Sequence, residues 1–312
     1  MSINNVILKL ENIQKWFPVR RTIENIIKGR RNWIKAVDGV SFEIGEGEIF
    51  ALVGESGCGK TTTARLVMKL LEPTGGKLIF RGEDVTRLDK KNLKTYRRNV
   101  QMIFQDPYAS MNPRFRAGDV LEEPLIIQRV GNDRDERRKI IARAMNEVRL
   151  QPPEEFVTRF PHMLSGGQRQ RVATARTLVL SPSLVVADEP VSMIDLSTRA
   201  QILHMMKTVQ KDLNLTYLYI THDLSTARYF ADRIAVMYLG KVVESGTVDT
   251  IFHDSKHPYT RALHKSIPKL GHTGNARLDT IRGMVPHPFA RPQGCSFHPR
   301  CESFMPGVCD RI

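Results

Sequence analysis

The stretch GESGCGKT, Gly54–Thr61, decides the fold. It matches the pattern G-x-x-x-x-G-K-[ST], it follows an apolar run typical of a buried strand, and it opens a helical pattern. Glycines in such a loop let backbone N–H groups surround phosphate oxygens, and the helix start adds partial positive charge. We expect Lys60 to reach the β- and γ-phosphates and the Thr61 hydroxyl to bind Mg²⁺.

A chance glycine-rich turn is the alternative for this loop, but the flanking strand and helix favour a nucleotide site. Cys58 lies inside it, and a small side chain that fits a tight turn explains this cysteine better than a reactive thiol. The expected nucleotide-binding residues here are Gly54, Glu55, Ser56, Gly57, Cys58, Gly59, Lys60, Thr61 and Thr62.

Two carboxylates end the apolar run LVVADEP at residues 184–190. The carboxyl ends of strands are where α/β sheets place their chemistry. Asp188 is suited to Mg²⁺, and Glu189 to orienting and deprotonating an attacking water. A carboxylate pair that merely caps a strand is the alternative. The two motifs together predict an NTPase and leave kinases, recombinases and GTPases open.

The chain alternates strand and helix patterns on both sides of a long helical region. Residues 3–17 alternate as an antiparallel strand does, 36–54 form two strands around a turn, and 58–73 form a helix that stops at Pro73. Residues 75–85 indicate a hairpin, 99–107 a short buried strand, and 113–175 only helices. Alternation resumes from 183 to a hairpin that turns at Gly240. This order predicts a mostly parallel, helix-flanked sheet.

Composition indicates a soluble protein with an anionic partner. The 312 residues are 41% hydrophobic, and the net charge is +14. We expect no secretory leader at the N-terminus, and no apolar run reaches the roughly 18–20 residues of a membrane span. Residues 20–35 are densely basic, which suits a membrane surface or an acidic partner as well as a solvated loop.

A second anion-binding helix start is predicted at LSGGQRQRV, residues 164–172. A single nucleotide bound to one compact domain does not need two phosphate-binding segments, the loop at 54–61 and the helix start at 164–172. A head-to-tail dimer resolves this, because each chain would then close this segment over the ATP held by its partner.

With these motifs in this order, the chain resembles the ATP-binding subunits of ABC transporters over roughly residues 3–266. The resemblance implies a P-loop ABC ATPase core with an antiparallel β subdomain and a helical subdomain at about 107–175. It implies Mg²⁺-dependent ATP hydrolysis and a dimer. It also implies that the signature residues Ser165, Gly166, Gly167 and Gln168 contact ATP.

The same resemblance assigns further single residues. Gln105 in MIFQDP matches the glutamine that senses Mg²⁺ and water, and Asp195 in SMID matches the D-loop aspartate. The family more often has alanine and leucine where this chain has Met193 and Ile194. His222 in ITHDL matches the histidine that contacts the γ-phosphate and supports the catalytic glutamate. Phe17 in KWFP matches the aromatic residue that stacks on adenine, with Trp16 as the second choice.

A narrower resemblance, to oligopeptide and dipeptide importers, rests on phrases such as FQDPYASMNPR and HPYTRALHKSIP. It implies a peripheral subunit at the cytoplasmic face of the membrane, a second identical or different ATPase subunit, two permeases and an extracytoplasmic substrate-binding protein. Related systems carry nickel or oligosaccharides. No nucleic acid is expected, although a soluble ABC ATPase acting on nucleic acid or ribosomes, or an ATP-binding regulatory module without turnover, remains the rival reading.

The last segment, residues 267–312, is expected to be an irregular tail beyond the ATPase domain at 1–266, because periodicity disappears there. It holds Cys295, Cys301 and Cys309. A disulfide is disfavoured, because we expect the chain to be cytosolic and three is an odd number of cysteines. Zinc with His298, three free thiols and an iron–sulfur cluster remain open. The importer resemblance implies a possible [4Fe–4S] cluster on four cysteines, but this tail has three.

Overall fold

The computed structural model describes residues 5–19, 33–267, 281–287 and 291–311. The basic segment at 20–35 lies outside them up to residue 32. The chain divides into two compact units. Unit 1 comprises residues 1–7, 44–49 and 87–220, and unit 2 comprises residues 8–43, 50–86 and 221–312. Each unit is a mixture of strands and helices, as the sequence predicts.

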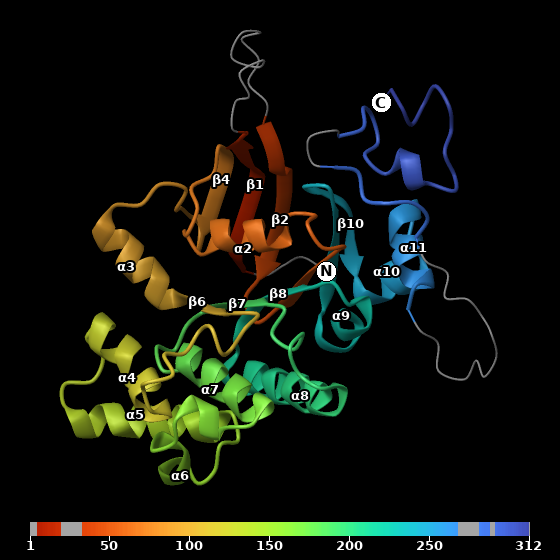
Figure 1. Cartoon of the computed structure of the whole chain (residues 1–312). Helices are drawn as coiled ribbons and strands as arrows, with labels where there is room; N and C mark the ends of the chain where they lie inside the picture. Colours follow the sequence, from red (N-terminus) through yellow and green to blue (C-terminus); the bar gives the residue numbers. More distant parts are fainter. Residues whose placement is uncertain (1–4, 20–32, 268–280, 288–290, 312) are drawn as a thin grey trace. The chain divides into compact units, whose positions relative to one another are not determined.

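An antiparallel sheet belongs mainly to unit 2 (Figure 1). Its strands are β1 (Val6–Pro18), β2 (Trp33–Gly45), β4 (Gly75–Phe80) and β5 (Glu83–Asp84), in the order β2-β1-β4-β5. β1 pairs with β4, and β4 with β5 in the expected hairpin, both antiparallel. The prediction of an antiparallel strand near the N-terminus and a hairpin at 75–85 is confirmed.

Unit 2 also carries the strand that leads into the glycine-rich loop. β3 (Ile49–Val53) is fully buried and pairs in parallel with β9 (Arg233–Tyr238). β9 turns at Gly240 into antiparallel β10 (Lys241–Thr247), as expected. The helices of this unit are α2 (Lys60–Val67), α9 (Leu224–Phe230), α10 (Val248–His253) and α11 (Pro258–Lys265).

Unit 1 is built on parallel strands with helices gathered beside them (Figure 1). β6 (Val100–Ile103) pairs with β7 (Leu184–Asp188), and β7 with β8 (Thr216–Thr221), all in parallel. The helices are α3 (Lys90–Asn99), α4 (Ala117–Gln128), α5 (Arg134–Glu147), α6 (Pro153–Val157), the short η1 (Pro161–Met163), α7 (Gly166–Leu178) and α8 (Leu196–Leu213).

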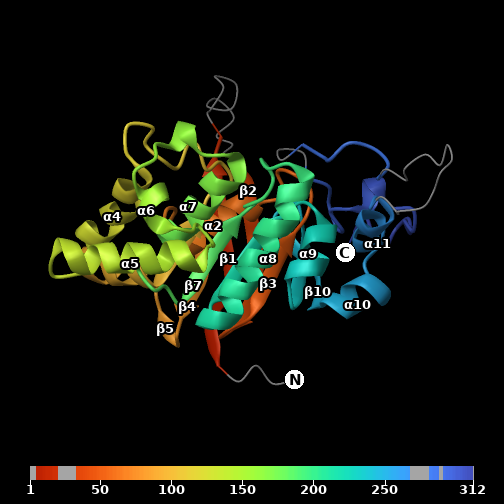
Figure 2. The ribbon, with the colours of Figure 1, turned by 90° about the horizontal axis from the view of Figure 1, so that it is seen from below.

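Helices α4 to α7 occupy the part of the chain that the sequence predicts to be helical. They pack on one another, and Figure 2 shows them as one group. Their contacts are made by buried apolar residues at helical spacing, including Leu121, Leu125, Ile141 and Met145. The prediction that this stretch contains helices is confirmed.

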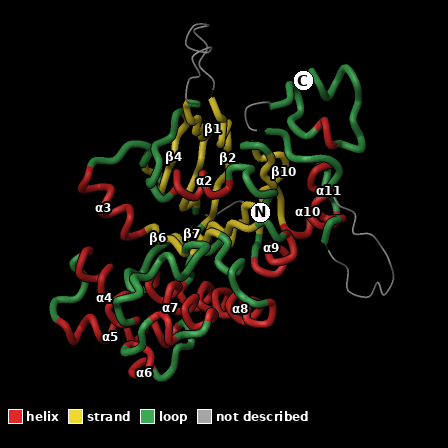
Figure 3. Tube along the Cα trace, in the orientation of Figure 1, coloured by secondary structure: helices red, strands yellow, loops and turns green. Residues whose placement is uncertain are grey.

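The described part of the tail contains one short helix, η2 (His298–Arg300), and is otherwise loop (Figure 3). Its ends are closed by a hydrogen bond from the Cys295 N–H to the Cys309 carbonyl at 2.9 Å. Phe297 and Arg300 are buried in this segment, with 2% and 7% of their surface exposed. In the described residues, no helix is long and apolar enough to cross a membrane.

Candidate functional site: the glycine-rich loop and the acidic strand end

The glycine-rich loop folds around the ammonium group of Lys60. Lys60 is the first residue of α2, and its Nζ donates to the carbonyl oxygens of Gly54 at 2.7 Å and Glu55 at 3.0 Å. The first turn of α2 contains no acidic residue. A buried cation at a helix N-terminus free of carboxylates in its first turn is an arrangement that favours a phosphate.

Two glycines of the loop are fixed by close packing within unit 2. Gly59 has φ of +110°, and a Cβ there would lie 2.3 Å from the Ala36 carbonyl. A Cβ on Gly54 would lie 2.1 Å from the Met237 carbonyl. Apart from its neighbours in the chain, no described residue has a heavy atom within 4 Å of the Cβ position of Gly57, so the middle of the loop faces open space. The loop therefore packs tightly at both ends and is open in between, which fits a cradle for phosphate oxygens.

Hydrogen bonds from outside the loop hold its backbone. The carbonyl of Cys58 accepts from the Gly240 N–H at 2.8 Å, and the N–H of Glu55 donates to the Tyr259 hydroxyl at 3.0 Å. Burial raises the pKa of the Cys58 thiol, which therefore stays protonated. This environment fits a small structural side chain. The sequence pattern did not identify Tyr259, although it lies in the phrase HPYTRALHKSIP.

Three further residues of unit 2 that the sequence analysis proposed for the nucleotide site, Phe17, Trp16 and His222, lie on strand ends and loops. Phe17 is half-buried near the end of β1, and the ammonium of Lys15 lies 5.3 Å from its ring centroid. Trp16, the second choice for the adenine platform, has Lys35 at 4.5 Å from its ring. His222 is exposed just before α9, whose first N–H groups are capped by the Asp223 carboxylate.

In unit 1 the structure brings two predicted catalytic residues together. The side-chain amide of Gln105 donates to the Glu189 carboxylate at 3.1 Å. Glu189 has φ of +47°, a left-handed conformation that is unusual for a residue other than glycine. Its neighbour Asp188 ends β7 and is buried, with 4% exposed. Two carboxylates therefore lie next to each other at the end of β7: Asp188 is buried, and Glu189 is held by the Gln105 amide.

The signature segment forms a capped helix start, as predicted. The Ser165 hydroxyl accepts from the Gln168 N–H at 3.2 Å, and the Gln168 side chain accepts from the Ser165 N–H at 2.9 Å. This reciprocal capping leaves the glycines between them at the N-terminus of α7. A Cβ on Gly167 would lie 2.5 Å from Cγ2 of Thr198 in α8. A Cβ on Gly166 would meet no atom of another described segment within 4 Å.

Asp195 caps the next helix. Its carboxylate accepts from the Thr198 N–H at 2.9 Å and from the Ser197 hydroxyl at 2.7 Å, at the start of α8. These hydrogen bonds lower its pKa to about 2, so the carboxylate is ionised at neutral pH. Within unit 1, Asp195 is therefore a helix cap on the exposed surface.

The tail cysteines do not form a metal-binding group. In the described ranges, no set of three or more His, Cys, Asp or Glu side chains is arranged to hold a metal ion. Burial raises the pKa of the Cys301 thiol, and neighbouring Cys295 and Cys309 add to the increase. The structure thus gives no support to the expected iron–sulfur cluster or to zinc, and neither enters the function proposed below.

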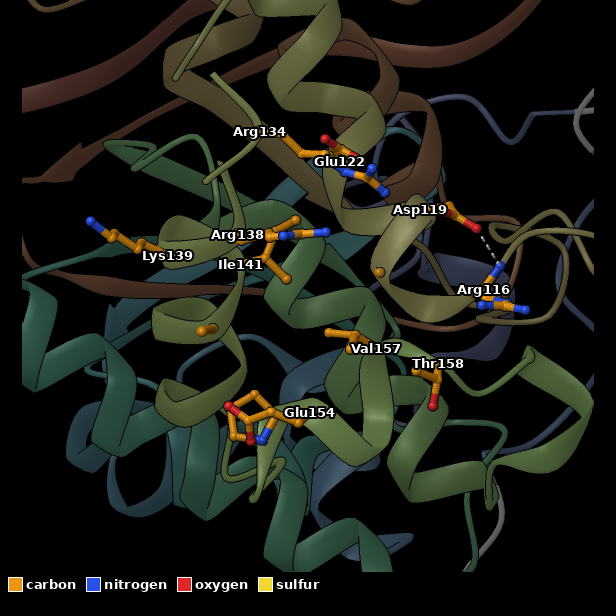
Figure 4. Close-up of a pocket in the computed structure, with 13 residues that line it drawn as sticks. Arg116, Asp119, Glu122, Arg134, Arg138, Lys139, Ile141, Glu154, Val157 and Thr158 are labelled. Carbon is orange, nitrogen blue, oxygen red and sulfur yellow. Dashed lines mark hydrogen bonds between the residues drawn. The ribbon is translucent and has the colours of Figure 1, made fainter. Parts of the chain in front are cut away.

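A separate pocket of about 550 Å³ lies among α4, α5 and α6 (Figure 4). Its lining mixes cations such as Arg134 and Arg138 with carboxylates such as Asp119 and Glu122. None of the predicted nucleotide-binding or catalytic residues lines it.

Two protein-family models match the chain. The model described as ABC transporter matches residues 37–192, which include the glycine-rich loop, Gln105, the signature segment and Glu189. The model described as the oligopeptide/dipeptide transporter C-terminal region matches residues 243–309.

Curated relatives are similar over nearly the whole chain. The dipeptide transport ATP-binding protein DppF of Haemophilus influenzae is 44% identical over 96% of this chain and 89% of its own length. The oligopeptide transport ATP-binding protein AppF of Bacillus subtilis is 42% identical over 97% of this chain and 91% of its own.

Solved structures share the fold. A dimeric post-hydrolysis structure of the ATP-binding cassette MJ0796, bound to ADP and Pi, has a TM-score of 0.67 and 30% identity, covering 78% of this chain and 99% of that chain. The cbiO1 protein of Clostridium perfringens, part of the ABC transporter complex cbiONQ, has a TM-score of 0.68 and 25% identity, covering 80% and 92% of the two chains.

Proposed function

Because the chain belongs to the ABC transporter family of ATP-binding subunits, we propose that it hydrolyses ATP to power the import of dipeptides or oligopeptides. ATP hydrolysis follows from the family itself. The peptide cargo is supported by the match of residues 243–309 to the oligopeptide/dipeptide C-terminal region and by the names of the relatives. The observation that carries the proposal is the glycine-rich loop closed around the buried Lys60 ammonium.

The phosphates of ATP would bind at the loop. Lys60 would exchange its hydrogen bonds with the Gly54 and Glu55 carbonyls for bonds to the β- and γ-phosphate oxygens. The backbone N–H groups of Ser56–Thr62 and the start of α2 would contribute further positive potential. Phe17 would stack on the adenine ring, because an aromatic face supplies contact area without needing a polar partner.

Hydrolysis would depend on the carboxylates that end β7. Glu189, held by the Gln105 amide at 3.1 Å, would orient the attacking water and accept its proton. His222 would contact the γ-phosphate. A bound Mg²⁺ would supply charge neutralisation of the phosphate oxygens. Oxygen donors suit this ion, and Thr61, Gln105 and Asp188 would provide them.

Two copies of the cassette would share their sites. The capped start of α7 offers Ser165, Gly166, Gly167 and Gln168 to an anion, and Gly166 faces open space. We place these residues, with Asp195, against the ATP held by a second ATPase subunit, identical or different. The relative MJ0796 has been solved as a dimer, which supports this arrangement.

Membrane permeases would dock near the segment around Gln105, from Phe104 to Phe115. Phe104, Tyr108 and Phe115 expose 43%, 57% and 40% of their surface. Large apolar side chains this exposed are typical of a protein–protein contact. The subunit would thus lie at the cytoplasmic face of the membrane beneath two permeases, which receive peptide from an extracytoplasmic binding protein.

The experiment that tests this function compares the wild-type chain with Lys60→Ala. We expect the wild type to hydrolyse MgATP, to lose that activity with EDTA, and to co-purify with integral membrane proteins from detergent extracts. Lys60→Ala should abolish ATP binding. ATP binding without any turnover, with the permeases present, would favour a regulatory module instead.

A further inference from the structure

A buried arginine of the tail, Arg300, forms an ion pair with the glycine-rich loop. The Arg300 side chain is 4% exposed, and its two terminal nitrogens donate to the two carboxylate oxygens of Glu55 at 2.7 and 3.0 Å. Glu55 is the second residue of the loop, and the two partners lie 245 positions apart in the sequence. A bidentate guanidinium–carboxylate pair fixes distance and orientation together.

The guanidinium is itself held in one orientation. Its Nε donates to the Arg282 carbonyl at 3.1 Å, and one terminal nitrogen lies 3.5 Å from the Tyr238 hydroxyl. The bond to Glu55 raises the pKa of Arg300, so the cation persists at every physiological pH. A buried, multiply bonded arginine is a rigid anchor rather than a mobile surface charge.

An aromatic cluster fixes the tail next to the loop. Phe297 packs edge-on against Tyr238, with ring centroids 5.3 Å apart, and at 5.2 Å from Tyr259. Tyr259 in turn accepts the hydrogen bond of the Glu55 N–H. Glu55 is therefore held at its backbone by α11 and at its carboxylate by the tail.

Because Glu55 lies in the glycine-rich loop, its ion pair with Arg300 affects nucleotide binding. Its carbonyl accepts from Lys60 at 3.0 Å and from the Cys58 N–H at 3.3 Å, so its backbone is part of the turn that would surround the phosphates. Its carboxylate is a negative charge beside a site for a polyanion. Pairing with Arg300 neutralises that charge and fixes the turn.

We propose that Arg300 is a positioning residue for the nucleotide site: through Glu55 it sets the glycine-rich loop in its phosphate-binding conformation and removes an electrostatic penalty for ATP. The tail would therefore contribute to ATP binding through Arg300. This inference rests on the proposed role of residues 54–61 as the phosphate-binding loop.

The test measures the KM and kcat of MgATP hydrolysis, with the Kd of a fluorescent ATP analogue, on the full-length chain. Arg300→Gln should raise KM and Kd about tenfold and leave kcat within about threefold, because ground-state binding is weakened and the hydrolytic carboxylate is untouched. Glu55→Gln combined with Arg300→Gln should recover part of the loss, since the unpaired carboxylate is gone. Arg311→Gln, which removes an exposed cation of the tail that does not contact Arg300 or Glu55, should change neither constant.

A second variant covers the case in which Arg300→Gln does not fold. Arg300→Lys keeps the charge but lacks the planar fork, and should raise KM by about threefold with a near-normal thermal unfolding midpoint. A lower midpoint with unchanged KM and Kd in either variant would overturn the proposal and leave a purely structural ion pair. If Lys60→Ala also binds ATP normally, the proposed nucleotide site itself fails; if only Lys60→Ala loses binding, the failure is confined to Arg300.

Discussion

Glu189 shows how a single strained residue can serve a catalytic site. Its left-handed φ of +47° is stabilised by three hydrogen bonds within unit 1. Its N–H donates to the Ile220 carbonyl at 2.9 Å, and its carbonyl accepts from the Ser192 N–H at 3.1 Å and hydroxyl at 3.0 Å. Surroundings that hold a disfavoured backbone are typical of functional sites, where they aim a side chain.

Replacing this carboxylate should separate binding from hydrolysis. Glu189→Gln keeps the shape of the side chain but removes the base, so we expect ATP hydrolysis to fall about 10²- to 10⁴-fold with unchanged ATP affinity. The exposed Glu154→Gln, in α6, is the matched control and should hydrolyse ATP normally. Hydrolysis by Glu189→Gln at the wild-type rate would exclude this residue as the base.

His257 makes a pH-dependent contribution to stability. Burial lowers the pKa of His257 below its usual 6.5, and the nearby Glu244 carboxylate opposes this only in part. The unfolded chain then takes up the proton first as the pH falls, so the folded state loses stability between about pH 7 and the lowered pKa.

The variant that tests this contribution is His257→Asn. In the wild type, His257 Nδ1 accepts a hydrogen bond from the Tyr259 N–H at 3.1 Å. The asparagine side chain also has an acceptor for that N–H, but it does not titrate. We expect the free energy of unfolding of the wild type to fall more steeply than that of the variant between pH 7.5 and 5.5, measured by urea denaturation. Parallel pH profiles for the two proteins would contradict this assignment.

Among the elements, most strands and helices follow from sequence periodicity, and the exceptions have physical causes. The helix after the loop ends at Val67, not at Pro73, because Lys69 adopts a left-handed conformation with φ of +54° and its side chain bonds the Thr86 carbonyl. The short α3 was not predicted, since Tyr96 is its only buried residue and no apolar stripe marks it. Its N-cap, Asp89, is the signal that could have found it.

The packing of α7 on α8 makes a prediction about the signature glycines. Gly167→Ala would place a methyl group 2.5 Å from Thr198 Cγ2, and β-branched threonine has few other rotamers. We expect a loss of about 1–3 kcal/mol in the free energy of unfolding. Gly166→Ala meets no atom within 4 Å and should change stability by less than about 0.5 kcal/mol.

Thermal and urea unfolding would measure both variants. Adding Thr198→Ser to Gly167→Ala removes the clashing methyl group and should restore most of the lost stability. Equal stability of the two glycine variants would show that the spacing between α7 and α8 does not depend on Gly167.

At the scale of the whole molecule, local patterns predicted the nucleotide loop, the acidic strand end and the signature helix start. Local sequence patterns could not predict the long-range contacts that position the nucleotide loop. The Arg300–Glu55 pair joins residues 245 positions apart, and Tyr259 reaches the loop from α11. Such contacts depend on the tertiary path of an irregular tail, where no periodicity points to a partner. The iron–sulfur expectation rested on cysteine count and resemblance, and the folded tail does not support it.

The proposed sharing of sites between two cassettes has a kinetic consequence. The ATPase rate per molecule should rise with protein concentration, or on adding the second ATPase subunit, because a single chain supplies one half of each site. Steady-state hydrolysis over a hundredfold range of concentration checks this. A constant specific activity for a chain that remains monomeric would contradict the shared-site arrangement.

The most direct test of the central claim is uptake of labelled dipeptide and oligopeptide by cells in which this chain is deleted and then restored. We expect the wild-type chain to restore ATP-dependent uptake, and Glu189→Gln, produced at the same level, to restore none. Uptake that is unaffected by the deletion, or fully restored by Glu189→Gln, would contradict the conclusion that hydrolysis by this subunit powers peptide import.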